Sequence, residues 1–210
     1  EFDGIWQTSE ADKAAIYGQT PGQVKVKDQN HDNVIDAKDK VILGQQLPKW
    51  TGSITNTFTY KNWDLAVTFQ GVLGNKIYNA TRLELEDVTR GGNYMSTVLD
   101  YWTPENTDAY YPKPYFNETK NQQAQDAYMQ KASYLRCKNI QLGYTLPTHI
   151  TEKAGISNCR IYLSCDNLFT ITGLSSVYDP EVFGSYDGYG TSGKTYPLQR
   201  TISVGVNLNF

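Results

Sequence analysis

The residues best suited to chemistry lie between Asp28 and Asp39, in the stretch DQNHDNVIDAKD. Their spacing matches a twelve-residue calcium loop, in which positions 1, 3, 5, 9 and 12 supply side chains and position 7 a backbone carbonyl. Calcium takes about six to eight oxygen ligands, and clustered carboxylates compensate for its dehydration. The spacing therefore predicts calcium as a cofactor, bound by Asp28, Asn30, Asp32, Val34, Asp36 and Asp39.

Two departures weaken this predicted site. Asn33 occupies position 6, where glycine usually adopts a positive φ, although asparagine tolerates that conformation. Asp39 replaces the usual glutamate of position 12 and is less able to bind with both oxygens. Val24 and Val26 alternate like a strand, so paired helices around the loop are not expected. The alternative is an acidic surface loop without metal.

Other chemical motifs are weak. The stretch GYGTSGKT, from Gly188 to Thr195, fits the phosphate-binding pattern G-x-x-x-x-G-K-[ST]. That mechanism needs a buried strand before the loop and a helix after it. Here Tyr196, Pro197 and an expected strand follow, so no nucleotide site is predicted.

No catalytic residue is predicted either. The chain has two histidines, His31 and His149, and neither is placed to form a nucleophile–base pair. The carboxylates of Glu84, Glu86 and Asp87 are expected to form a solvated helix face.

Composition leaves a membrane protein open. The chain has 210 residues and a net charge of -3, which gives no sign of a nucleic-acid partner. No apolar run approaches the roughly 18 residues of a transmembrane helix, but strands of a transmembrane barrel alternate and would escape that test. The 16 Tyr, 7 Phe and 4 Trp fit either interfacial aromatic girdles or an aromatic-rich β-sandwich. The three cysteines are interpreted as packing residues.

Strict alternation of apolar and polar residues predicts strands. It is clearest in RTISVGVNLNF at the end of the chain and in the segment that follows Lys61 and Asn62, where a tight hairpin turn is expected. A change of parity near Lys138 and Asn139 predicts either a β-bulge or a strand end above the membrane, where the alternation relaxes. Strands are expected over 49–60, 62–71, 133–145, 159–171 and 198–210. The residues expected to face the membrane are Trp63, Leu65, Val67, Phe69, Ile202, Val204, Val206, Leu208 and Phe210.

The connections between these strands alternate between long and short, as in outer-membrane barrels. Residues 1–48, 72–132 and 172–197 are expected to be external loops, and the short connections then lie on the periplasmic side. The predicted fold class is all-β: about five strands of a large transmembrane antiparallel β-barrel. Because such barrels have at least about eight strands, the chain is expected to be the C-terminal part of a longer protein.

The loop 72–132 is rich in aromatic residues. They are interpreted either as a contact surface for a substrate or partner, since aromatics make rigid anchors, or as the internal packing of a large ordered loop. The residues concerned are Trp102, Tyr110, Tyr111 and Tyr115.

Several motifs in order resemble one family. They are the acidic loop followed by ILGQQLP, YKNWDL and FQG, then YWTPENTDAYYPKP, ASYLRCKNIQLGYTLP, GISNCRIYLSCDNLFTIT, YDPEV and YPLQRTISVGVNLNF. Together they resemble the C-terminal portion of the SusC/RagA-type TonB-dependent outer-membrane transporters. His31 and Asn33 stand where this family usually has glycines.

The resemblance implies a plugged barrel of about 22 strands in a bacterial outer membrane. It implies import of nutrients, most often oligosaccharides and sometimes peptides, driven through TonB and assisted by a SusD-like surface lipoprotein. The plug and the TonB box would lie outside this chain.

Two other classes of protein remain open on the residues alone. The first is a soluble, secreted, calcium-stabilised β-sandwich that binds carbohydrate. The second, a hydrolase, is disfavoured because no catalytic constellation is found.

Overall fold

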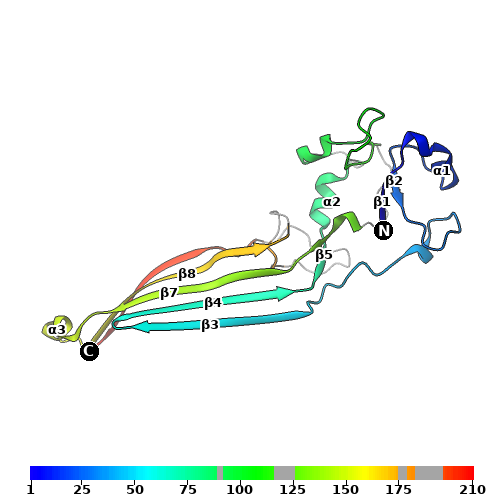
Figure 1. Cartoon of the computed structure of the whole chain (residues 1–210). Coiled ribbons are helices and arrows are strands. Elements are labelled where there is room, and N and C mark those ends of the chain that lie inside the picture. Colours follow the sequence, from blue (N-terminus) through cyan, green and yellow to red (C-terminus); the bar gives the residue numbers. More distant parts are fainter. Residues whose placement is uncertain (89–91, 116–125, 175–178, 183–195) are drawn as a thin grey trace. The chain divides into compact units, whose positions relative to one another are not determined.

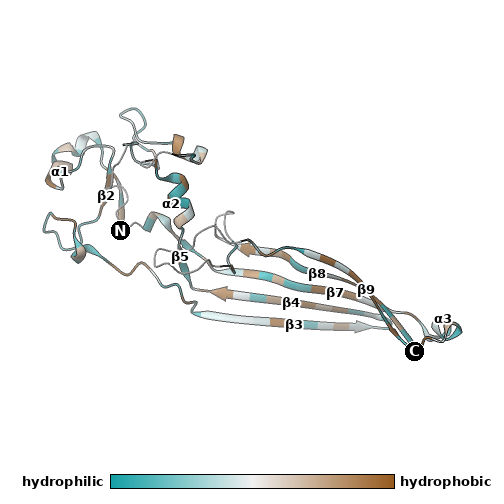
Figure 2. Cartoon of the chain, turned by 180° about the vertical axis from the view of Figure 1, so that it is seen from behind, coloured by the Kyte–Doolittle hydropathy of each residue, from teal (hydrophilic) through white to brown (hydrophobic). Residues whose placement is uncertain are grey.

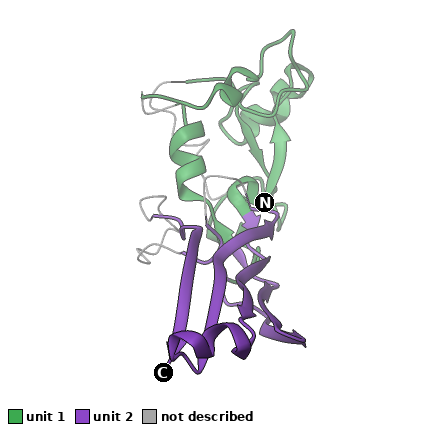
Figure 3. Cartoon of the chain, turned by 90° about the vertical axis from the view of Figure 1, so that its left-hand side faces the viewer, with its two compact units in different colours: residues 1–45, 77–129, 185–192 green, residues 46–76, 130–184, 193–210 purple. Residues whose placement is uncertain are grey.

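The computed structural model describes residues 1–88, 92–115, 126–174, 179–182 and 196–210. The chain divides into two compact units, which are described separately here (Figure 3). Unit 1 comprises 1–45, 77–129 and 185–192, and unit 2 comprises 46–76, 130–184 and 193–210. Among the described residues, none of the helices is both long and apolar enough to cross a membrane.

Unit 2 is built on one antiparallel sheet of five strands in the order β3-β4-β7-β8-β9 (Figure 1). Each strand pairs with its neighbour through long, nearly continuous ladders. The five-stranded antiparallel sheet predicted from alternation is therefore confirmed. The strands are β3 (Trp50–Tyr60), β4 (Trp63–Leu73), β7 (Tyr134–Thr145), β8 (Asn158–Thr172) and β9 (Thr201–Asn209).

A two-residue turn joins β3 to β4, as expected. Lys61 rather than Asn62 takes the left-handed conformation, with φ of 53°. Asn62 instead uses its side chain: Nδ2 donates to the Thr145 carbonyl at 2.9 Å, while the Thr145 N–H donates to the Asn62 carbonyl at 2.8 Å. The turn is thus fastened to the end of β7.

The predicted bulge in β7 is confirmed. Opposite β4, Thr68 pairs with Asn139 and Phe69 with Cys137, so Lys138 is the additional residue. A second irregularity lies beside it in β8, where Asn167 has φ of 52°. The bulge returns the apolar residues on both sides of Lys138 to one face of the sheet, which explains the change of parity in the sequence.

Unit 1 is an assembly of short elements. Strands β1 and β2 pair antiparallel, and the neighbouring core contains Trp6, Ala14 and Val24, which are all buried. The elements of this unit are β1 (Phe2–Ile5), α1 (Ala11–Ile16), β2 (Val24–Val26) and α2 (Ala80–Glu86), with 3₁₀ turns at Thr8–Glu10, Ala37–Asp39, Ser96–Leu99 and Asp126–Tyr128.

Four further elements lie in the described chain. Strands β5 (Lys76–Tyr78) and β6 (Met129–Lys131) form a third, two-stranded sheet. The connection from β7 to β8 contains α3 (Thr148–Thr151) and a 3₁₀ turn at Glu152–Ala154, which ends at Gly155 in the left-handed conformation that favours glycine.

Candidate functional site

One face of the five-stranded sheet is apolar across all five strands. Residues paired directly across an antiparallel ladder point to the same face, so the register decides which side chains share it. Alternating apolar and polar bands along the strands are visible in Figure 2. This apolar face comprises Trp50, Ile54, Phe58, Tyr60, Trp63, Leu65, Val67, Phe69, Leu135, Cys137, Ile140, Leu142, Tyr144, Ile161, Leu163, Cys165, Phe169, Ile171, Ile202, Val204, Val206 and Leu208.

Among the described residues, most large side chains of the apolar face are exposed, although Cys137 and Cys165 are buried. Val204 is 73% exposed, Ile202 68% and Ile54 65%. Proteins in water rarely leave a continuous apolar patch of this kind open, because water contact with it is unfavourable. All the predicted membrane-facing residues of β4 and β9 lie on this face, and Phe210 follows the last of them. The face therefore requires an apolar surrounding.

The opposite face of the sheet is polar. Asp64, Thr68, Gln70 and Asn207 lie on it. The remaining members are mostly small hydroxyl residues, amides and charged residues, together with Ala66, Tyr162 and two glycines. This polar face comprises Thr51, Ser53, Thr55, Thr57, Thr59, Asp64, Ala66, Thr68, Gln70, Arg136, Asn139, Gln141, Gly143, Arg160, Tyr162, Ser164, Asp166, Thr170, Thr201, Ser203, Gly205 and Asn207.

Two glycines of the polar face create room for larger neighbours. Gly143 lies between Asp64 and Tyr162 in the register, and the side chain of Arg160 passes over it to reach Asp64. Gly205 lies opposite Tyr162, whose ring occupies the space that a Cβ at 205 would fill. The sequence pattern predicted strands here but gave no sign of these contacts, which depend on the register.

The acidic loop of unit 1 is held by its own carboxylates. Asp28 accepts hydrogen bonds from the backbone N–H groups of His31 at 2.7 Å and Asn33 at 2.8 Å. Asp39 accepts from the N–H groups of Asp36 and Gln29, both at 2.8 Å. These bonds hold the pKa of Asp39 below its usual range. Both carboxylates are buried, so the loop is folded around them.

The other predicted calcium ligands face outward. Asn30, Asp32, Val34 and Asp36 are intermediate or exposed, and Asp32 bonds the Val34 N–H and Lys38. In the part of the chain that the structure describes, no group of three or more His, Cys, Asp or Glu side chains is gathered as a metal site. Within the loop, Asn33 has a φ of 64°, the conformation that position 6 of a calcium loop requires.

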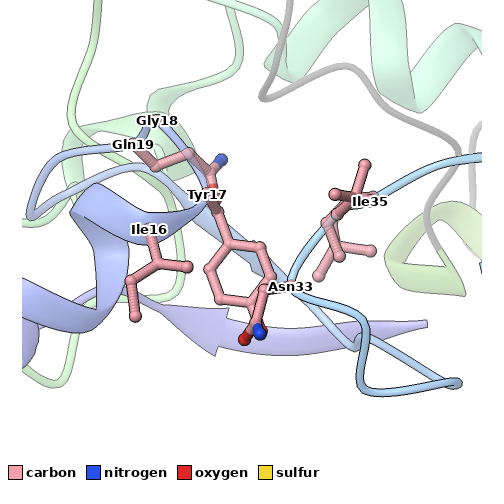
Figure 4. Close-up of a pocket in the computed structure, with 8 residues that line it drawn as sticks. Ile16, Tyr17, Gly18, Gln19, Asn33 and Ile35 are labelled. Atoms are coloured by element: carbon pink, nitrogen blue, oxygen red, sulfur yellow. The ribbon is translucent and has the colours of Figure 1, made fainter.

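A cavity of about 410 Å³ lies beside this loop (Figure 4). Its lining includes Ile16, Tyr17 and Gln19 from α1 and the following turn, and Asn33 and Ile35 from the loop. The Tyr17 hydroxyl donates to Asp28 at 3.3 Å, and burial together with Asp28 raises the pKa of Tyr17. Tyr17, which lines the cavity, is therefore hydrogen-bonded to Asp28 of the acidic loop.

The four aromatic residues predicted as a contact surface separate into two groups. Trp102 and Tyr111 are buried, and the Trp102 Nε1 donates to Gln7 Oε1 at 2.9 Å, so both serve the packing of unit 1. Tyr110 is 49% exposed and Tyr115 is intermediate. Only Tyr110 and Tyr115 of these four keep accessible surface for a partner.

The prediction of a solvated carboxylate face holds for Glu84, which is exposed, but was wrong for Glu86 and Asp87. Helix α2 forms, but Glu86 and Asp87 are buried. Arg82 Nε lies 2.8 and 2.9 Å from the two oxygens of Glu86, one helical turn away, which makes burial of the charge tolerable. The glycine-rich stretch 188–195 lies outside the described residues.

Comparison with known proteins places the sheet in a family. No family model matches the chain. TonB-dependent receptor P26 of Formosa agariphila is 32% identical over 221 residues, which cover 100% of this chain and 22% of the receptor. TonB-dependent receptor SusC of Bacteroides thetaiotaomicron is 26% identical over 185 residues, covering 87% of this chain and 17% of SusC.

Solved structures agree. A structure of the RagAB peptide importer in the open-open state aligns over the whole chain with a TM-score of 0.74 and 26% identity, and a second RagAB structure with 0.76 and 25%. The chain belongs to the SusC/RagA-type TonB-dependent receptors. It spans 22% of the P26 receptor and of the matching RagAB chain. These relatives are TonB-dependent receptors and a peptide importer, and this resemblance favours the transporter over the soluble sandwich and the hydrolase.

Proposed function

We propose that this chain forms part of the barrel wall of a TonB-dependent outer-membrane importer. The observation that carries the proposal is the continuous exposed apolar face of a sheet whose other face is polar. An apolar exterior and a polar interior are what a transmembrane barrel requires. In the described residues the sheet ends at β3 and β9, whose outer edges offer unpaired backbone groups for further strands of a closed barrel.

The cargo and the partners are proposed by analogy with other members of the family. We propose import of oligosaccharides, with peptides as the alternative that the RagAB peptide importer favours. A SusD-like surface lipoprotein would bind on the outer side, and TonB would act through a plug region outside this chain. The division into external loops at 1–48, 72–132 and 172–197 remains a prediction that the same function supports.

The direct test is uptake by the receptor that contains this chain. Cells expressing it with its neighbouring lipoprotein should accumulate a labelled oligosaccharide or peptide, and deletion of TonB should abolish accumulation. Co-purification of the lipoprotein is the second readout. Absence of TonB-dependent uptake of both ligand classes, with the receptor correctly assembled in the membrane, would contradict the proposal.

We further propose that the acidic loop 28–39 takes up calcium on the outer side of the membrane. Residue types, their spacing and the positive φ of Asn33 support it. Asp32 and Asp36 would have to turn toward Asp28 and Asp39, since they are not gathered in the structure. Calorimetric titration with calcium should show binding that Asp28→Asn removes; equal heats in the unchanged and substituted receptor would contradict it.

A further inference from the structure

Arg136 is a buried cation on the polar face that bonds Asp179 and Glu181, which lie between β8 and β9 in the sequence. Arg136 on β7 is 3% exposed, and each of its three nitrogen groups donates to a different residue. Nη2 donates to Asp179 at 2.6 Å, Nη1 to Glu181 at 2.9 Å and Nε to Thr170 at 2.8 Å. Arg136 therefore joins β7, β8 and the segment 179–182.

Asp179 closes the base of that connection. Its Oδ1 accepts from the Glu181 N–H at 3.0 Å as well as from Arg136, and its Oδ2 accepts from the N–H of Leu198 at 3.0 Å. Leu198 lies 19 residues further on, just before β9. Burial opposes ionisation, but the Glu181 N–H, Arg136 and the Leu198 N–H outweigh it, so the pKa of Asp179 lies below its usual range. One carboxylate thus joins the described segment 179–182 to Leu198, just before β9.

The bulge in β7 adds a second cation. Lys138 Nζ lies 2.5 Å from Glu181 Oε1, and the next residue, Asn139, donates to Asp166 at 2.7 Å. In a regular strand two consecutive residues face opposite sides, whereas the bulge at Lys138 directs both toward the polar face. The bulge therefore lets Lys138 join Arg136, Asp179 and Glu181 on the polar face, while Asn139 keeps its place on that face.

We infer that Arg136 and Lys138 are positioning residues that clamp Asp179 and Glu181 onto the polar face and so hold residues 179–182 and Leu198 beside the sheet. A buried guanidinium must be paired, because an isolated charge in a poorly hydrated site is strongly unfavourable. Loss of Asp179 or Arg136 is therefore expected to weaken all the bonds among Arg136, Lys138, Asp179 and Glu181 rather than one bond. Where the polar face lines the pore, which rests on the proposed function, the clamp sets the position of Asp179, Glu181 and Leu198 beside the path of the cargo.

The test uses the receptor that contains this chain, in membranes, with three variants. Asp179→Asn removes the charge, Arg136→Lys keeps the charge but loses the fork of donors, and Arg200→Gln changes an exposed arginine near Leu198 as the control. Assembly is checked first by the heat-dependent electrophoretic mobility of the barrel. Hydrogen exchange then follows the amides of residues 181–182 and 198–200 against those of β7 and β8.

We expect the Leu198 and Glu181 amides to exchange at least about tenfold faster in Asp179→Asn and Arg136→Lys, because a hydrogen bond to a charged group is lost. Strand amides and the Arg200→Gln receptor should be unchanged. In the unsubstituted receptor the protection should fall as pH drops through the lowered pKa of Asp179, and Asp179→Asn should lack that pH dependence. Unaltered exchange in both cluster variants, or equal acceleration in Arg200→Gln, would overturn the clamp.

Uptake separates the clamp from the proposed function. We expect Arg136→Lys to raise the cargo concentration for half-maximal uptake several-fold while the maximal rate is kept. Faster exchange with unchanged uptake would overturn the positioning role beside the pore. Failure of the unsubstituted receptor to import either cargo class would count against the proposed function, and the exchange measurements would still decide whether the clamp exists.

Discussion

The guanidinium group of Arg160 on β8 forms a bidentate ion pair with the carboxylate of Asp64 on β4, two strands away. Nε donates to Oδ1 at 2.9 Å and Nη2 to Oδ2 at 2.5 Å. The side chain crosses β7 at Gly143, which is the residue paired with Asp64. A fork-to-fork pair of this kind is geometrically specific, and it can form only where the intervening strand has no side chain.

Replacing Gly143 by alanine should break this ion pair. An added Cβ would lie 2.5 Å from Asp64 Oδ1 and inside contact distance of the Arg160 guanidinium. Overpacking of this kind costs about 1–3 kcal/mol of unfolding free energy. Gly71→Ala is the matched control, because its Cβ would meet Leu135 Cδ1 at an ordinary 3.7 Å. Urea unfolding of the receptor in lipid measures both, and equal stabilities would contradict the account.

The contact between Tyr162 and Gly205 predicts a coupled pair of substitutions. Alanine at 205 would collide with the Tyr162 ring, whose Cε1 would lie 2.6 Å from the new Cβ. We expect Gly205→Ala to lower the unfolding free energy by about 1–3 kcal/mol, and to cost much less when Tyr162→Ala is already present. A double-mutant cycle gives the coupling, and strictly additive effects would show that the ring is not the obstacle.

Gly22 should be intolerant of alanine for two reasons. Its φ is +92°, and an added Cβ would lie 2.7 Å from Trp102 Cε3 and 2.8 Å from Lys113 Cβ. Gly4 has a φ of +103° with nothing within 4 Å, so Gly4→Ala carries the backbone strain alone. The Trp6 and Lys113 amides, which bond Gln23 and Gly22, should exchange faster in Gly22→Ala than in Gly4→Ala. Equal exchange rates in Gly22→Ala and Gly4→Ala would contradict the close packing of Trp102 against Gly22.

The acidic loop should open at low pH. The pKa of Asp39 is lowered in the folded loop by the Asp36 and Gln29 N–H groups. A group with a lowered folded pKa stabilises above its unfolded pKa, near 4, and that contribution is lost as pH falls through the folded value. Protection of the Gln29 and Asp36 amides should therefore decline only below about pH 4. Asp39→Asn should lower protection at neutral pH, with Asp12→Asn in α1 as the control, and protection that persists in Asp39→Asn would contradict this.

Much of the sheet could be predicted from the sequence because alternation is a local property. The strand from Thr201 to Asn209 and the bulge at Lys138 both follow from which positions are apolar, without knowledge of the neighbours. The same residues carry the apolar face, since parity along a strand decides the side on which a residue lies.

The contacts of the polar face could not be predicted in this way. Arg160 and Asp64 are 96 residues apart in sequence, and Arg136 and Asp179 are 43 apart, so pairing depends on a register that no local pattern gives. Burial of Glu86 was missed for a related reason. Arg82 lies one turn from Glu86 on the same helix, but the burial of the Glu86 carboxylate depends on the tertiary fold around α2.

A membrane-spanning wall requires one face of β9 to contact lipid and the other to contact water. A scan of spin-label accessibility along this strand measures both contacts directly. Labels placed singly at residues 201–208 of the receptor in lipid bilayers would report contact with oxygen, which partitions into lipid, and with a water-soluble nickel chelate. Labels at Ile202, Val204, Val206 and Leu208 should favour oxygen, and those at Thr201, Ser203 and Asn207 the chelate. Chelate contact without a period of two, or lipid contact on the polar residues, would contradict a membrane-spanning wall.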